Sequence, residues 1–215
     1  MTTVMQMRRP EFIAAQGRHP HGYLGAIITW IMSRETAADN KQAIALLGLK
    51  ERDRVLDVGT GHGRSLRTIA ALAREGFAVG IDSSETALRI ARRANCALIR
   101  AGHVSVEYAR SDTLHFADAS FDKALSVHTL YFWRSAAPHL AEVARVLKPN
   151  GKFVLGFRPA EDSAATRRFP ESIYAFRTTA EVETLLSKAG FVVCRKQQRD
   201  TPGDSMVWIV ARRAA

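Results

Sequence analysis

Cysteine and long apolar runs are scarce in this chain of 215 residues. The two cysteines, Cys96 and Cys194, lie far apart without metal-ligand spacing, so we expect two buried small hydrophobic side chains rather than a disulfide or a ligand pair. The longest apolar run, residues 23–32, is interrupted by Gly25 and Thr29 and is shorter than the roughly 20 residues of a membrane-spanning helix. The sequence therefore predicts no disulfide scaffold, no metal site and no transmembrane segment.

The N-terminal segment does not have the pattern of a secretory leader. Its first twelve residues include two arginines, but neither an apolar stretch nor a small-residue cleavage site follows them. We therefore expect a cytoplasmic protein.

Acidic residues are outnumbered by basic ones, 21 to 31, which gives a formal net charge of +10. Such an excess can attract an anionic partner such as RNA or an acidic membrane surface. The basic residues are scattered and form no long run, which is typical of a solvated surface. We therefore expect no nucleic-acid partner, whereas peripheral contact with a membrane stays open, as does the oligomeric state.

The length suits one domain around one core. From residue 54 onward, short apolar runs alternate with helical patterns, and this alternation predicts an α/β fold with a mostly parallel sheet between two layers of helices. The last two strands are joined by a short polar turn at 200–204, which permits only an antiparallel pair. The expected strands are 54–58, 77–81, 104–108, 121–127, 152–157, 191–196 and 206–211, and the expected helices are 63–74, 84–94, 136–147 and 179–189.

The N-terminal part has a different pattern. Residues 1–21 show no periodicity and contain two prolines and a glycine, so we expect an irregular arm there. Two helices are expected to follow, at 23–34 and 36–47, the second ending at Gly48. We accordingly divide the chain into an N-terminal arm with helices, 1–48, and a ligand-binding domain, 49–215, within the same fold. The first of these helices can close over a ligand as a lid or pack permanently on the sheet.

The loop after the first strand carries glycine at alternate positions, Gly59, Gly61 and Gly63, at the entry to a helix. In open α/β sheets, ligands bind outside the carboxyl ends of the strands. Glycine there lets the backbone turn tightly and approach a ligand, and the helix N-terminus adds unpaired N–H donors. Asp57 begins this loop, where an acid suits an ammonium group or its ordered water rather than a pyrophosphate.

Two further carboxylates follow the next two strands. Asp82 lies about 20 residues beyond the glycine loop, the position at which a carboxylate can accept both hydroxyls of a ribose. Asp112 follows the third strand, where it can reach an adenine amino group. Both aspartates could instead cap the helices that are expected after them. Together with the glycine loop they predict a nucleoside ligand.

The pattern of the loop narrows the choice of cofactor. A dinucleotide fingerprint requires a third glycine for close helix packing, and Arg64 occupies that position. The phosphate-binding pattern that ends in Gly-Lys-Ser/Thr is absent as well. A nicotinamide, a flavin and a nucleoside triphosphate are therefore disfavoured, and S-adenosylmethionine suits the ammonium, ribose and adenine positions.

With these motifs in order, the sequence resembles the Rossmann-like, seven-stranded (class I) S-adenosylmethionine-dependent methyltransferases. VLDVGTGHG at 55–63 is similar to the family's glycine motif, and VGIDSSETALRIARR at 79–93 to its ribose-binding segment. ARSDTLHFADASFDKALSV at 109–127 and LAEVARVLKPNGKFVL at 140–155 resemble the adenine-side motif and the fifth strand, with Asn150 where glycine is usual. The resemblance implies the strand order 3-2-1-4-5-7-6 with strand 7 antiparallel, the cofactor S-adenosylmethionine and the product S-adenosylhomocysteine. The cofactor contacts that we expect are Asp57, Gly59, Thr60, Gly61, Gly63, Asp82, Ser83, Asp112, Thr113 and Ser126.

The segment after the fourth strand, SVHTLYFW at 126–133, is where the family's methyl donor and acceptor meet. In-line transfer of an activated methyl group needs chiefly positioning, so a general base is optional. His128 is the best candidate for a base because imidazole titrates near neutral pH, and Tyr131 is a second candidate for a catalytic role. Phe132 and Trp133 could line the acceptor pocket or belong to an ordinary core.

Three functions compete at this point. The first is methyl transfer to a small molecule, since short connections after the fourth and fifth strands leave no room for a recognition domain. The second is methylation of a phospholipid at a membrane surface, suggested by the positive charge and by Trp30 in the apolar segment. The third is a cofactor-binding or nucleic-acid-binding module without catalysis.

Overall fold

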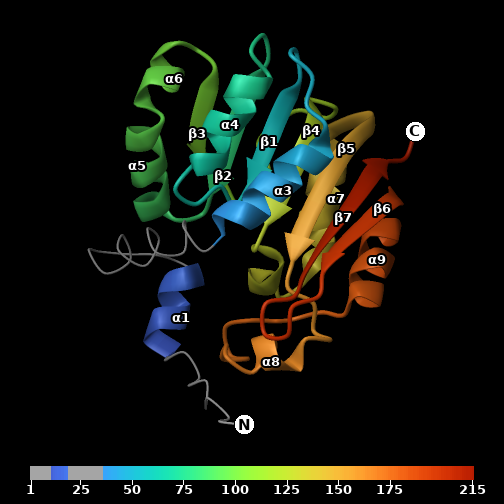
Figure 1. Cartoon of the computed structure of the whole chain (residues 1–215). Helices are drawn as coiled ribbons and strands as arrows, with labels where there is room; N and C mark the ends of the chain where they lie inside the picture. The colour runs from blue at the N-terminus through green and yellow to red at the C-terminus, as the bar shows by residue number, and fades with distance from the viewer. Residues whose placement is uncertain (1–10, 19–35) are drawn as a thin grey trace.

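The structure is a computed structural model that describes residues 11–18 and 36–215. Its strands are β1 (Arg54–Val58), β2 (Phe77–Asp82), β3 (Val104–Tyr108), β4 (Phe121–Val127), β5 (Leu147–Phe157), β6 (Phe191–Arg199) and β7 (Met206–Arg213). They form one sheet in the order β3-β2-β1-β4-β5-β7-β6 (Figure 1). Strands β1 to β5 pair in parallel, and β7 pairs antiparallel with β5 and β6. The expected fold class and strand order are confirmed, including the antiparallel seventh strand.

Helices cover both faces of the sheet, as the alternation of patterns predicts (Figure 1). One face carries α3 (Ala37–Leu47), α4 (Arg64–Leu72) and α5 (Glu85–Ala94), whose buried residues share one core cluster. The opposite face carries α7 (Ala136–Val146) and α9 (Thr179–Lys188) in a second cluster. Short helical segments that the sequence did not predict are α6 (Cys96–Arg100), η1 (Leu130–Phe132) and α8 (Ser163–Thr166).

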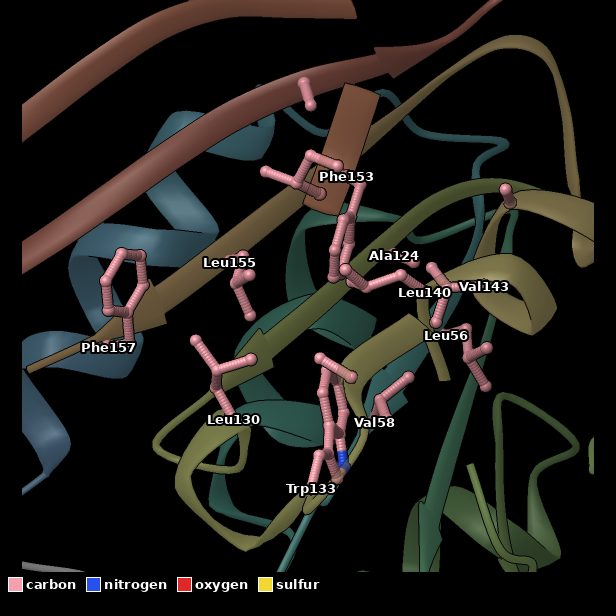
Figure 2. Close-up of a cluster of buried hydrophobic side chains, with 14 of the residues drawn as sticks. Leu56, Val58, Ala124, Leu130, Trp133, Leu140, Val143, Phe153, Leu155 and Phe157 are labelled. Atoms are coloured by element: carbon pink, nitrogen blue, oxygen red, sulfur yellow. The ribbon is translucent and has the colours of Figure 1, made fainter. Parts of the chain in front are cut away.

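The central strand β5 shows how the sheet separates the two clusters. Phe153, Leu155 and Phe157 belong to the same core cluster as Leu140 and Val143 of α7 (Figure 2), whereas Val154 belongs to the cluster of the α3 side. This period of two is the geometry of a strand that is buried on both faces. Leu130 and Trp133, from the chain after β4, pack against the same side (Figure 2). The strand ends are therefore held in a packed core, which fixes the loops that follow them.

The N-terminal arm differs from its expectation. Glu11–Arg18 form a helix, α1, where the sequence predicts irregular chain. Glu11 lies in the first turn, where the helix dipole stabilises a carboxylate. Its side chain accepts a 3.0 Å hydrogen bond from the Ser172 hydroxyl. Ala14 is buried in the core cluster of the α7 side. The prediction of irregular chain was wrong because Pro10 and Pro20 lie outside this helix and Gly17 lies only in its last turn. The predicted helix and lid at 23–34 lie outside the described residues.

Both cysteines are also placed differently from the expectation. Cys96 and Cys194 are free and exposed, so the prediction that they are buried is wrong. Cys96 begins the short helix α6, and Cys194 lies on the edge strand β6. In residues 11–18 and 36–215, no helix is long and apolar enough to cross a membrane.

Candidate functional site

A cavity of about 760 Å³ opens beside the loops that follow β1, β2, β3 and β4. Its volume falls within the range of about 300–1,000 Å³ that is typical of pockets for small molecules. The place agrees with the rule that ligands bind at the carboxyl ends of parallel strands. The predicted site residues on its wall are Gly59, Thr60, Gly61, Asp82, Ser83, Asp112 and His128.

The glycine loop after β1 is held close to β2 and to the loop after β4. The backbone N–H groups of Gly59 and Thr60 both donate to the carbonyl of Ile81, at 2.9 Å each. Gly59 has a φ of +77°, and a Cβ there would lie 2.0 Å from Cγ2 of Thr129. Gly61 has a φ of +57°, but a Cβ there would meet no atom within 4 Å. Gly59 is therefore required for packing, whereas Gly61 leaves open space on the cavity wall for a ligand.

Asp82, at the end of β2, holds the loop from the other side. Its Oδ2 accepts from the backbone N–H of Gly61 at 3.0 Å, and its Oδ1 accepts from that of Ser84 at 2.9 Å. Ser84 itself caps α5, since its hydroxyl accepts from the N–H of Ala87. The alternative that Asp82 is the helix cap is thus wrong. A carboxylate offers about four acceptor sites, so these backbone contacts are compatible with hydroxyl donors from a ligand.

Asp57 lies beneath the loop and is absent from the cavity wall. Its side chain is only 3% exposed, and its Oδ2 accepts from the hydroxyls of Thr60, at 2.7 Å, and Ser65. Burial raises the pKa of Asp57 to about 6, although these two hydrogen bonds oppose the shift. Asp57 thus fixes the loop to the first turn of α4.

The raised pKa of Asp57 predicts a pH dependence of stability. A carboxyl group with a higher pKa in the folded state binds its proton more tightly there than in the unfolded chain. The contribution of Asp57 to the free energy of unfolding is therefore complete below pH of about 4. It is lost as the pH rises through about 6, which lowers the free energy of unfolding by on the order of 2–3 kcal/mol. Asp57→Asn should flatten this decline, because an amide does not ionise. Urea denaturation at a series of pH values between 4 and 8, about half a pH unit apart, measures how the free energy of unfolding changes with pH.

Asp122→Asn is the matched control for this experiment. The pKa of Asp122 is lowered, because hydrogen bonds from Lys148 and from the N–H of Arg54 outweigh the opposing effect of burial. Its contribution to the free energy of unfolding is constant above its unfolded pKa of about 4 and is lost only below it, so Asp122→Asn should leave the slope between pH 4 and pH 8 as in wild type. Equal pH profiles of wild type and Asp57→Asn would contradict the raised pKa.

Asp112, after β3, lies on the wall in an ion pair with Arg110. The guanidinium Nε and Nη2 donate to Oδ1 and Oδ2 of Asp112 at 3.1 and 2.7 Å, and this pairing lowers the pKa of that carboxyl group. No helix follows Asp112, so the helix-cap alternative is wrong here as well. The neighbouring Thr113 is exposed and off the wall, with its N–H bonded to the carbonyl of Arg110.

His128, after β4, has a left-handed backbone with a φ of +61°, and its ring is engaged on both sides. Its Nε2 lies 2.8 Å from Oδ2 of Asp39, and its Nδ1 lies 2.9 Å from the hydroxyl of Tyr131. That hydroxyl already accepts from the N–H of Arg158 at 2.6 Å, so its proton is available to Nδ1. Since a carboxylate only accepts, Nε2 carries the ring proton and donates it to Asp39. In this arrangement neither ring nitrogen can take a proton from an acceptor molecule.

Tyr131 is buried behind His128 and does not line the cavity. Burial raises the pKa of its hydroxyl, so the phenol stays protonated at neutral pH. The structure therefore places Tyr131 as a partner of His128 and out of reach of an acceptor in the cavity.

Asp39, on α3, is the residue of this network that sequence reasoning missed. It is 2% exposed, and its Oδ1 accepts from Nη1 of Arg199 at 2.7 Å, in addition to the contact with His128. Burial alone would raise the pKa of Asp39, but the hydrogen bonds from His128 and Arg199 lower it. Its backbone carbonyl accepts from Nε1 of Trp208 at 3.1 Å. Asp39 thus joins α3 to the end of β4 and to the β6–β7 hairpin.

Two other predicted contacts lie behind the wall. Ser126 is fully buried, and its hydroxyl donates to the carbonyl of Val58 at 3.1 Å, which links β4 to β1. Gly63 precedes α4 with a φ of +71°, beside Ala91 of α5 and Asn95 at the end of that helix. Both residues support the loop instead of facing the cavity.

The rest of the wall includes residues that the sequence did not single out as contacts. Phe132 and Trp133 line the cavity, and they also belong to the aromatic core of the α7 side, so both alternatives given for them describe part of their surroundings. Trp133 stacks on His139 at 4.6 Å between ring centroids, and Nδ1 of His139 lies 2.8 Å from the Ser111 hydroxyl. One side of α3 completes the wall with Thr36, Ala37, Asn40, Lys41 and Ile44. Within the described parts of the chain, no group of three His, Cys, Asp or Glu side chains is placed to hold a metal ion.

Comparison with known proteins agrees with this geometry. A family model described as a methyltransferase domain matches residues 56–155. The O-methyltransferase rstn1 of Aspergillus nomiae is 31% identical over 157 residues, which cover 70% of this chain and 69% of that protein. The demethylmenaquinone methyltransferase of Tropheryma whipplei is 40% identical over 116 residues, 54% of this chain and 46% of its own length. The chain spans about half the length of some of the relatives that it matches, 52% for the O-methyltransferase cnsE of Penicillium expansum.

Solved structures show the same fold. A methyltransferase of Haloferax volcanii, determined in complex with the activator Trm112, superposes with a TM-score of 0.78 at 23% identity, covering 88% of this chain and 94% of that one. An S-adenosylmethionine-dependent methyltransferase of Aquifex aeolicus gives a TM-score of 0.66 at 24% identity, covering 81% and 89% of the two chains. The sheet order, the site at the strand ends and these matches together show that the chain belongs to the Rossmann-like, seven-stranded S-adenosylmethionine-dependent methyltransferases.

Proposed function

We propose that this protein transfers the methyl group of S-adenosylmethionine to an oxygen atom of a small-molecule acceptor, by in-line displacement. The observation that carries the proposal is the single cavity at the strand ends, where the glycine loop, Asp82 and Asp112 share one wall. The carboxylates lie on β2 and after β3, next to the loop after β1, in the order in which one extended nucleoside ligand would meet them.

The residues of the wall fit the parts of this cofactor. The open space above Gly61 and the N–H groups at the start of α4 would take its methionine part, including the carboxylate. Asp82, with Ser83 beside it, would accept from the ribose hydroxyls, and Asp112 would meet the adenine amino group. Asp57 acts indirectly, since it holds Thr60 and Ser65 in place.

When bound, S-adenosylmethionine supplies a methyl group that is already activated by its sulfonium. The task of the chain is to orient the two reactants and to exclude water, which can provide a large part of the rate acceleration. The packed core fixes the loops after β1, β2 and β4 for that purpose. His128 and Tyr131 shape the end of β4 in this proposal, and neither serves as a base.

The printed names of several relatives support an oxygen acceptor, because they are O-methyltransferases. Besides the helices α7 and α9 that cover the sheet, the connections after β4 and β5 hold only η1 and α8, which favours a small molecule over a large partner that needs its own recognition domain.

Binding of the reaction product tests the cofactor assignment directly. We expect S-adenosylhomocysteine to bind the purified protein with one molecule per chain in native mass spectrometry, and to give a saturable heat signal in titration calorimetry. NAD serves as the control ligand, since it shares the adenosine part but has a pyrophosphate that this loop does not suit. Equal binding of both ligands, or no binding of S-adenosylhomocysteine, would contradict the proposal.

A further inference from the structure

Charged groups on the cavity wall are unbalanced in favour of cations. Arg110 is neutralised by its two hydrogen bonds to Asp112. Asp82 accepts from the neutral backbone N–H groups of Gly61 and Ser84, so its negative charge offsets one of the other positive charges on the wall. Across residues 11–18 and 36–215, no carboxylate forms an ion pair with the remaining three cations. These cations are Lys41 on α3, Arg64 at the start of α4 and Arg134 before α7.

The cofactor by itself increases this imbalance. S-adenosylmethionine has one carboxylate against an ammonium and a sulfonium, so it adds a net positive charge to a cavity that already has an excess. Its carboxylate suits the first turn of α4, where backbone N–H groups and Arg64 are available. Lys41 and Arg134 are then left without an anion. Both side chains are exposed and water screens their repulsion, but a negative charge on the second ligand would still be favourable beside them.

The hydrogen bonds of the wall imidazoles lead to the same conclusion. His128 stands at the end of β4, but Asp39 and Tyr131 occupy both of its ring nitrogens. His62 belongs to the glycine loop, where its Nδ1 accepts from the N–H of Arg64, and His139 lies beside Ser111 at the β3 end. His139 also stacks on Trp133 of the segment after β4. Among the described residues, the imidazole that directly follows β4 is therefore not available as a base for a hydroxyl acceptor.

From these two observations we infer that the acceptor is acidic and reacts as an anion, with its ionised oxygen held by Lys41 and Arg134. The inference rests on the proposed function, and it names the class of acceptor for the same site. The ionised oxygen donates an electron pair to the methyl carbon, the carbon–sulfur bond breaks, and its electron pair stays on the sulfur. No proton has to be removed, so the balance requires no base. Carboxylates and acidic phenols both provide this chemistry.

Binding of matched anionic and neutral probes tests the inference without turnover. The protein is saturated with S-adenosylhomocysteine, and the affinity of this complex for each probe is measured by ligand-observed NMR and calorimetry at a slightly alkaline pH. Benzoate is compared with benzamide, and 4-nitrophenolate with nitrobenzene, so that the two arms separate a carboxylate from a phenolate. At least one anion should bind about tenfold or more tightly than its neutral partner, since hydrogen bonds to charged groups are the stronger ones.

Variants locate the anion in the cavity. Lys41→Gln and Arg134→Gln should each weaken binding of the preferred anion severalfold while affinity for S-adenosylhomocysteine stays at the wild-type value. Arg93→Gln removes the same charge from an exposed position on α5 outside the cavity, and it should change neither affinity. The inference is overturned if anions and neutral partners bind equally, if no anion binds, or if the two cavity variants weaken S-adenosylhomocysteine instead. Failure of wild type to bind S-adenosylhomocysteine would count against the proposed function itself.

Discussion

Replacing Asp82 with alanine is expected to weaken S-adenosylhomocysteine binding by a factor on the order of 100, the value of two hydrogen bonds to a charged group with partial replacement by water. The proposed ribose contacts would be lost. The N–H groups of Gly61 and Ser84 would also lose their acceptors, so the loop itself would be less well held. Asp82→Asn should be milder, because its amide oxygen can still accept and its NH₂ group can donate to a hydroxyl. Titration calorimetry, with thermal unfolding in parallel, measures both effects.

The two variants distinguish the roles of Asp82. If the carboxylate only holds the loop, Asp82→Ala lowers the melting temperature while affinity at a temperature well below unfolding stays near that of wild type. Such a result would remove the ribose contact from the proposal. If it binds the ribose, affinity falls in a protein that is still folded.

Replacing Gly59 with alanine is expected to destabilise the protein by about 2–5 kcal/mol, the combined cost of a left-handed alanine and of overpacking. Its φ is +77°, and the new Cβ would lie 2.0 Å from Cγ2 of Thr129. Thr129→Ser removes that methyl group and keeps the hydroxyl that bonds to Ser126. The double variant should therefore recover the overpacking part of the loss. Urea denaturation of the two single variants and the double variant gives the coupling energy.

Gly61→Ala is the matched comparison within the same loop. Its φ of +57° carries the left-handed cost of about 1–2 kcal/mol, but no atom lies within 4 Å of the added Cβ. We expect a smaller loss of stability than in Gly59→Ala and a larger loss of cofactor affinity, because the methyl group would point into the cavity. Equal destabilisation by the two alanines would contradict the assigned contact with Thr129.

Much of the sheet could be predicted from sequence because the strands are buried and end at clear signals. Strands β1, β3 and β4 have the bounds that were expected, and Gly59 and Gly61 after β1 lie on one cavity wall with Asp112 after β3. Asn150 in the turn of β5 adopts a φ of +62°, which explains why the family usually has glycine there. The short segments α6, η1 and α8 were missed because three to five residues are too few to show a helical period.

The site could be predicted only at the ends of the strands. Asp39 was missed because its partners His128 and Arg199 are 89 and 160 positions away in sequence, and nothing near it in the chain shows that it is buried. Ser126 and Tyr131 were expected to contact ligands because they are close in sequence to the end of β4, but strand and loop geometry turns them behind the wall. The division of the chain at residue 48 and the lid stay predictions.

The contact of Asp39 with Arg199 has a consequence for how this protein can acquire new substrates. Arg199 ends β6 and stacks over Trp208, so one arginine that does not line the cavity braces the helix that forms its wall. Substitutions at position 199 would let α3 shift against His128 while every residue on the wall keeps its identity. Selection for a different acceptor therefore has a target in the C-terminal hairpin, and libraries confined to the lining residues would leave it out.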